Sequence, residues 1–194
     1  MLLPLVGGQN MPQTIKIAKK VLALGQVYRL LEPGPVVLLT TGDRHRADVM
    51  TMSWHVMMDF EPPVVGLIVS NRNYSFDILR MTKECVINIP EARLAKAVVG
   101  CGNCSGREVD KFRKFGLTPM PASLVGPPLI AECFANLECK VIDARMADQY
   151  NLFVVEVLRA WIDPARKDPR TLHHRGMGYF MVAGKTIRLP SKKK

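Results

Sequence analysis

The turn from Ser70 to Ser75 carries the clearest set of groups for binding an anion. It leads from an apolar run into a segment where Phe76 and Leu79 have helical spacing. The first N–H groups of a helix lack intrahelical partners, and hydroxyls and a guanidinium beside them complete an anion site. Ser70, Arg72 and Ser75 are therefore candidates for holding an anion. The structural alternative is an ordinary capped turn with an exposed arginine.

Two of the five cysteines have a spacing that can do chemistry. Cys101 and Cys104 are two residues apart, as in half of a zinc site or in a redox dithiol. A metal site needs further ligands, but alternation turns Cys133 and Cys139 toward the core, and Cys85 opens a strand of its own. We expect free thiols and assign no residue to a metal. A metal-thiolate or partner-binding module using Cys101 and Cys104 is the alternative function.

Other catalytic groups are not marked out by the sequence. The four histidines have no spacing that places two on one helical face, and there is no nucleophile elbow, Walker loop or dinucleotide-binding glycine fingerprint. No pair of carboxylates is set up for acid–base work. A bound cofactor can carry the chemistry without such groups, so the catalytic residues stay unassigned.

Composition limits the classes of partner. The formal charge of +10 suits nucleic acid, an acidic protein or an anionic small molecule. Much of the excess lies in a basic stretch at 166–175 and in the tail Lys192–Lys194, without interleaved aromatic residues, so we expect no nucleic-acid partner. The apolar runs are far shorter than the ~20 residues of a membrane span, and the N-terminus lacks the basic region of a signal peptide. These features predict a cytoplasmic protein without a membrane partner.

Short apolar runs separated by turns predict a mainly β protein, because strands outnumber helices. A barrel with helical insertions fits this order better than a doubly wound parallel sheet. Helices are expected near Ile15–Leu22, after Ser75, and at Glu91–Val99 and Val109–Phe115, the last two closing near Gly100 and Gly116. The expected strands are 36–41, 47–54, 64–70, 85–89, 132–142, 152–161 and 185–189.

An ordered series of motifs resembles the flavin reductase-like domains. The series is Pro35–Thr41, Asp48–Trp54, Glu61–Val65, Ser70–Ser75, Glu84–Pro90, and Ser105–Arg107 with Asp110–Phe112. Its later members resemble the flavoredoxin branch in particular. The resemblance implies an N-terminal extension at 1–29, an FMN-binding domain at 30–190 and a basic tail at 191–194. It also implies a Greek-key split β-barrel that binds FMN at a homodimer interface.

The resemblance assigns three segments to the cofactor. Thr51, Met52, Ser53 and Trp54 would lie along the isoalloxazine ring, and the Ser70–Ser75 turn would take the phosphate. Ser105, Gly106, Arg107 and Lys111 would face the cofactor near the interface, with Arg107 and Lys111 on one helical face because they are four residues apart. For Thr51 and Ser53 the alternative is two polar residues on the outer face of a strand. For Arg107 and Lys111 it is a solvated basic helix.

Asp48 departs from the asparagine that the resemblance leads us to expect. Its carboxylate either changes the electrostatics near the flavin or pairs with Arg44 or Arg46. The implied function is flavin-based electron transfer, in which FMN accepts electrons from NAD(P)H or from a redox protein. A reductase that releases flavin and a carrier that retains it are both possible. Four clamp groups, Ser70, Arg72, Ser75 and Lys111, favour retention.

Overall fold

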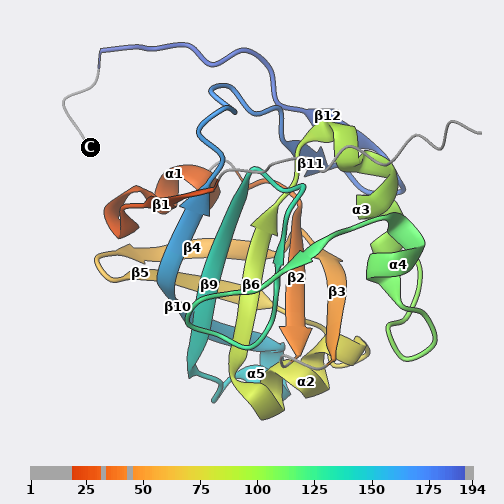
Figure 1. Cartoon of the computed structure of the whole chain (residues 1–194). Helices are drawn as coiled ribbons and strands as arrows, with labels where there is room; N and C mark the ends of the chain where they lie inside the picture. Colours follow the sequence, from red (N-terminus) through yellow and green to blue (C-terminus); the bar gives the residue numbers. More distant parts are fainter. Residues whose placement is uncertain (1–18, 32–33, 43–45, 191–194) are drawn as a thin grey trace, which may run out of the picture.

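Strands make up most of the molecule, as the apolar runs predict. The computed structural model describes residues 19–31, 34–42 and 46–190 (Figure 1). The main sheet contains β1 (Lys20–Leu22), β2 (Val37–Gly42), β3 (Ala47–Met52), β4 (His55–Phe60), β5 (Pro63–Ile68), β6 (Glu84–Ile89), β9 (Ala135–Asp143) and β10 (Leu152–Ile162). Two small sheets pair β7 (Pro119–Met120) with β8 (Leu129–Ile130), and β11 (Leu172–His174) with β12 (Phe180–Val182).

The strand order shows that the main sheet curls into a barrel. Its path is β3-β2-β6-β9-β10-β5-β4, all antiparallel, and β1 pairs with β10. The two ends of this path, β3 and β4, are joined in the chain by Ser53 and Trp54 alone. A link of two residues requires the first and last strands to lie near each other, so the sheet closes except at a seam between them. The predicted mainly β barrel is confirmed (Figure 1).

The central strands are buried on both faces. In β2, Leu39 packs inside the barrel, while its neighbour Leu38 packs in a second cluster outside it with Val98 and Cys101 of α3 (Ala95–Gly102). Successive side chains of a strand point to opposite faces. A helix covering the outer face therefore lets every residue of β2 be buried. This outer layer also forms the site.

The helices match the prediction in part. The remaining helices are α1 (Tyr28–Leu31), α2 (Tyr74–Thr82), α4 (Lys111–Phe115) and α5 (Ala147–Tyr150), with 3-10 turns at Leu24–Gln26 and Ala92–Leu94. Three helices, α2, α3 and α4, lie where the sequence predicts helices, with different ends, whereas α1 and α5 were not predicted. Gly116 ends α4 with φ of 64°, as expected. Helix α3 instead continues past Gly100, and that glycine lets α4 pack closely against α3. A Cβ there would overlap the ring of Phe115.

Several predicted elements are wrong. Strand β4 was not predicted. No strand forms at 185–189, and the last two strands, β11 and β12, lie before that segment. Lys20–Leu22 forms β1 rather than the end of a helix, and residues 15–18 of the predicted N-terminal helix fall outside the described residues. Cys133 precedes β9 and packs in the outer cluster.

The first half of the outward face of β9 is buried, whereas Lys140 and Ile142 further along it are exposed. Asn136 and Glu138 are fully buried there. Glu138 accepts hydrogen bonds from the backbone N–H groups of Ser123 and Leu124 and from Nε1 of Trp161. Buried polar groups require such partners, so the 119–130 segment completes a second layer. Within the described residues, no helix is long and apolar enough to cross a bilayer.

Candidate functional site

A polar pocket of about 320 Å³ lies along β3, between the start of α2, the end of α3 and the turn before α4. Six of the residues predicted from the sequence line it: Thr51, Arg72, Ser75, Ser105, Gly106 and Lys111. They come from three segments that are far apart in the chain. Met50, Asn73, Tyr74 and Asn103 also line the pocket and were not predicted.

The turn before α2 brings Arg72 and Ser75, but not Ser70, to the pocket. The hydroxyl of Ser70 accepts a hydrogen bond from the N–H of Arg72 (3.3 Å), and the Ser70 carbonyl accepts one from Asn73 (2.9 Å). Ser70 therefore shapes the turn and does not itself line the pocket. The Asn73 side chain makes no capping hydrogen bond to α2, which leaves N–H groups of the first turn available to an anion. Arg72 is exposed at the pocket.

Asp48 lies at the centre of a buried polar cluster in the pocket wall. The Ser75 hydroxyl donates a hydrogen bond to its Oδ2 (2.9 Å), and Nζ of Lys111 lies 3.4 Å from its Oδ1. Nζ of Lys111 also donates to the carbonyl of Val49 (2.7 Å). The expected partner of Asp48 was Arg44 or Arg46. Its ion pair is with Lys111, and Arg44 lies outside the described residues.

Two glycines bring the backbone close to β3. A Cβ on Gly106 would overlap the Asp48 carboxylate, so only glycine fits there without displacing it. At Gly102 a Cβ would lie 3.4 Å from Cβ of Thr51, which is ordinary contact. The space beside Gly106 is therefore filled by the carboxylate of Asp48.

The predicted ring segment contributes one residue to the pocket. The Thr51 hydroxyl bonds the carbonyl of Val98 at the pocket wall. Met52 packs in the barrel core, Ser53 is half-buried, and Trp54 is 71% exposed. The carbonyl of Trp54 accepts a hydrogen bond from the N–H of Ile68 (2.9 Å). The segment thus leads from the pocket toward the seam of the barrel.

Arg107 does not share a helical face with Lys111, contrary to the prediction. Helix α4 begins at Lys111, because Asp110 caps it by accepting a hydrogen bond from the N–H of Arg113 (3.1 Å). Arg107 instead pairs with Asp77 of α2 at 2.8 Å and lies over the ring of Tyr74 at 5.0 Å from its centroid.

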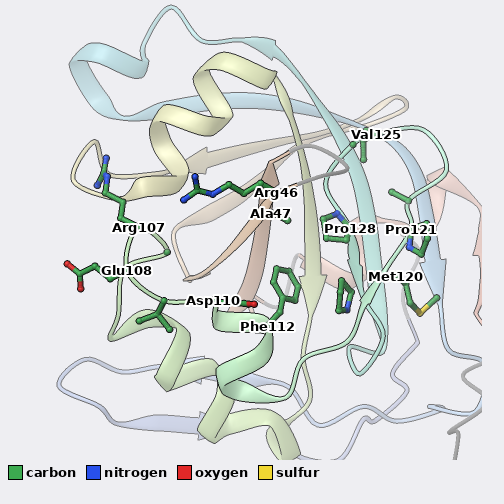
Figure 2. A pocket seen from close by; sticks show the side chains of 15 residues that line it. Arg46, Ala47, Arg107, Glu108, Asp110, Phe112, Met120, Pro121, Val125 and Pro128 are labelled. Atoms are coloured by element: carbon green, nitrogen blue, oxygen red, sulfur yellow. The ribbon is translucent and has the colours of Figure 1, made fainter.

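A second, larger pocket adjoins the first at Gly106. It has a volume of about 840 Å³ and extends between α4 and the 119–128 segment (Figure 2). Figure 2 shows Phe112 on the α4 side and Met120, Pro121 and Val125 on the other. This pocket reaches Ala47 at the start of β3, whereas the predicted ring segment begins at Thr51, near the end of that strand. It therefore borders the polar pocket on the side away from that segment.

The cysteines near the pocket are not arranged as metal ligands. Among the described residues, no three His, Cys, Asp or Glu side chains gather closely enough to hold a metal ion. All five cysteines are free thiols, as expected. Burial raises the pKa of Cys101 from 9.0 to about 12, so it stays protonated at neutral pH. Cys104 donates a weak hydrogen bond to the carbonyl of Gly100 (3.4 Å).

Comparison with known proteins identifies the fold and the family. The model of the flavin reductase like domain matches residues 28–181, which is most of the chain. The chain belongs to the flavin reductase-like domain family. Its split-barrel architecture, predicted from the motif series, is thereby confirmed, and the seam between β3 and β4 is where this barrel is open.

Three relatives of this flavin reductase-like chain are informative. YddH of Escherichia coli K12, an uncharacterized protein, is 32% identical over 179 residues, covering 84% of this chain and 94% of YddH. The FMN-binding domain of a flavin reductases-like enzyme from Shewanella baltica has a TM-score of 0.82 at 26% identity, covering 89% and 98% of the two chains. Flavoredoxin of Desulfovibrio vulgaris has the same fold, with a TM-score of 0.73 at 22% identity, covering 82% and 91%.

Proposed function

We propose that this flavin reductase-like chain binds FMN and takes part in flavin-based electron transfer. One observation carries the proposal. Six residues assigned to the cofactor from the motif series, in segments far apart in the sequence, line one polar pocket. Membership of the family supports it, and so does the structural likeness to a domain described as FMN-binding.

The pocket residues fit a phosphate monoester. Within the described chain, the guanidinium of Arg72 has no hydrogen-bond or ion-pair partner of its own, and it stands beside the uncapped first turn of α2. This combination of a guanidinium and free N–H groups favours a dianion. Gly106 lets the turn before α4 lie directly against Asp48 in the pocket wall. A phosphate here would place the flavin ring toward Thr51 and Trp54.

The seam supports a homodimer that covers the ring. Four large apolar side chains are exposed on β4 and just before it: Trp54, Val56, Met58 and Phe60. Strand β4 ends the sheet path, and an exposed apolar edge of this kind marks an interaction surface. A second copy packed on this edge would exclude water from a ring lying along Thr51–Trp54.

Bound FMN would supply the redox chemistry, accepting electrons from NAD(P)H or from a redox protein. The chain's own residues bind and orient the flavin. Three of the four expected clamp groups are already engaged: the hydroxyl of Ser70 by the turn, and Ser75 and Lys111 by Asp48. Arg72 is the clamp cation left to the phosphate. The sequence alone favours retention of FMN, whereas these contacts favour its exchange.

The binding proposal is tested by titrating the purified protein with FMN and following flavin fluorescence. We expect saturation at one FMN per chain. Protein that shows no flavin spectrum after FMN is added, and contains no extractable FMN, would refute the proposal. Zinc or iron in that protein would support the metal-thiolate alternative.

The two flavin mechanisms are separated by NAD(P)H oxidation with and without excess free FMN. A reductase turns over the added flavin, so its steady-state rate rises with free FMN. A carrier oxidises at most one equivalent of donor per bound flavin unless an acceptor protein is present. The engaged clamp leads us to expect turnover of added flavin.

The dimer is tested with Met58→Glu on β4, and Met81→Glu on α2 is the matched control. Both methionines are exposed, at 54% and 78%, but Met81 lies outside the β4 surface. We expect Met58→Glu to be a monomer by light scattering and Met81→Glu to keep the wild-type mass. A wild-type protein that is monomeric at all concentrations would exclude the dimer.

A further inference from the structure

Asp48 is a buried carboxylate in the wall of the pocket proposed to hold phosphate. Its side chain is 5% exposed. It contacts Ser75 of α2 and Lys111 of α4, and it lies against Gly106 in the turn that joins α3 to α4. One side chain on β3 thus fixes three separate segments of the pocket.

The contacts of Asp48 decide what the neighbouring groups can offer an anion. A serine hydroxyl has one hydrogen, and Ser75 donates it to Asp48. The Lys111 side chain is 4% exposed, with Nζ directed to the Val49 carbonyl and the Asp48 carboxylate. Its charge is therefore offset inside the wall. The cation left for a ligand is Arg72.

A carboxylate at position 48 is not required for these contacts alone. An asparagine has nearly the same size against Gly106, and its amide oxygen can still accept the Ser75 hydrogen bond, although without the charge that strengthens a bond to a carboxylate. A buried charge costs free energy that an amide does not. What the carboxylate adds is a negative charge beside Lys111 and beside the phosphate pocket.

We propose that Asp48 is the positioning residue that sets the affinity of this pocket for the phosphate of FMN. It holds Ser75, Lys111 and the Gly106 turn in place, and its charge cancels that of Lys111. The pocket therefore binds a dianion less tightly than its residue types suggest. This keeps FMN exchangeable. The inference rests on the proposed FMN binding.

The test compares FMN with riboflavin, which lacks the phosphate, in the wild type, Asp48→Asn and Asp77→Asn. Asp48→Asn removes one buried charge beside the pocket, and at short range this changes the affinity for a dianion by about tenfold or more. We expect FMN to bind about tenfold more tightly and riboflavin to be unchanged. Asp77 is 63% exposed on α2, so Asp77→Asn should change either affinity by less than about twofold, because water screens its charge.

Two results would overturn the inference. One is FMN affinity that is unchanged or weaker in a folded Asp48→Asn protein. The other is an equal change for FMN and riboflavin, which would indicate a structural effect without action on the phosphate. If the wild type binds neither flavin, it is the proposed function that fails.

A double variant, Asp48→Asn with Lys111→Met, provides a second measurement should the single variant not fold. It removes both charges and so leaves the net charge of the wall as in the wild type. We expect FMN affinity within about threefold of the wild type, since the missing charges cancel. A loss of tenfold or more would show that Lys111 binds the phosphate directly and would overturn the inference.

Discussion

Two carboxylate–cation pairs flank helix α2, and they differ in how much water reaches them. Arg107 and Asp77 are 2.8 Å apart with side chains 52% and 63% exposed, whereas Lys111 and Asp48 are 3.4 Å apart with side chains 4% and 5% exposed. Exposed pairs contribute about 0–1 kcal/mol, but removing one partner of a buried pair leaves a charge without compensation. The Lys111–Asp48 pair, although its atoms are farther apart, is therefore the pair on which the site depends.

Lys111→Met should have the largest effect, because it leaves the Asp48 carboxylate buried without its cation. We expect the free energy of unfolding to fall by about 3–5 kcal/mol. Urea denaturation measures this. The double variant with Asp48→Asn should recover most of the loss, and a double variant as unstable as the single one would show that the pair is not the cause.

Arg72→Ala should weaken FMN binding by about 1.5–3 kcal/mol, the value of a lost hydrogen bond to a charged group. Because Arg72 is exposed and makes no internal contact with its guanidinium, stability should change by less than about 0.5 kcal/mol. Fluorescence titration and urea denaturation of the same preparation measure both. Unchanged FMN affinity would remove Arg72 from the site.

Gly106→Ala should displace the Asp48 carboxylate and destabilise the protein by about 1–3 kcal/mol, as overpacking does. Gly102→Ala is the matched control, since its new methyl group would only contact Thr51 at 3.4 Å. Thermal unfolding compares the two variants. Equal melting temperatures would mean that the turn at Gly106 moves to accommodate the methyl group without disturbing the pair of Asp48 with Lys111.

Arg107→Ala should have the smallest effect on stability, below about 1 kcal/mol, because its ion pair with Asp77 is exposed. Salt should screen what remains of this pair. A loss of stability comparable to that of Lys111→Met would break the contrast between the two pairs.

The sequence allows the Ser70–Ser75 turn to be predicted because all of its groups are contiguous and precede a helix. The pair of Asp48 with Lys111 is not predictable in this way, because folding brings together two segments with no shared pattern. The one indication in the sequence that Asp48 needs a buried partner is its position between apolar residues of a buried strand. The start of α4 was misplaced although Asp110 is a good N-cap.

Strand β4 was missed for a different physical reason. Its apolar residues Val56, Met58 and Phe60 face outward, so their pattern does not mark a core-facing strand. The strand is held by its ladder with β5. An outward apolar face of this kind becomes informative once the barrel seam is known, since it then marks the surface proposed for the second copy.

The central claim is that the pocket beside α2 holds the phosphate of FMN. The most direct measurement is the affinity of the wild-type protein for FMN relative to riboflavin, at low and high salt. The account predicts that FMN binds at least about tenfold more tightly at low salt, because charge-assisted hydrogen bonds from Arg72 are worth about 1.5 kcal/mol or more, and that the preference falls as salt rises. Equal affinity for the two flavins would contradict it.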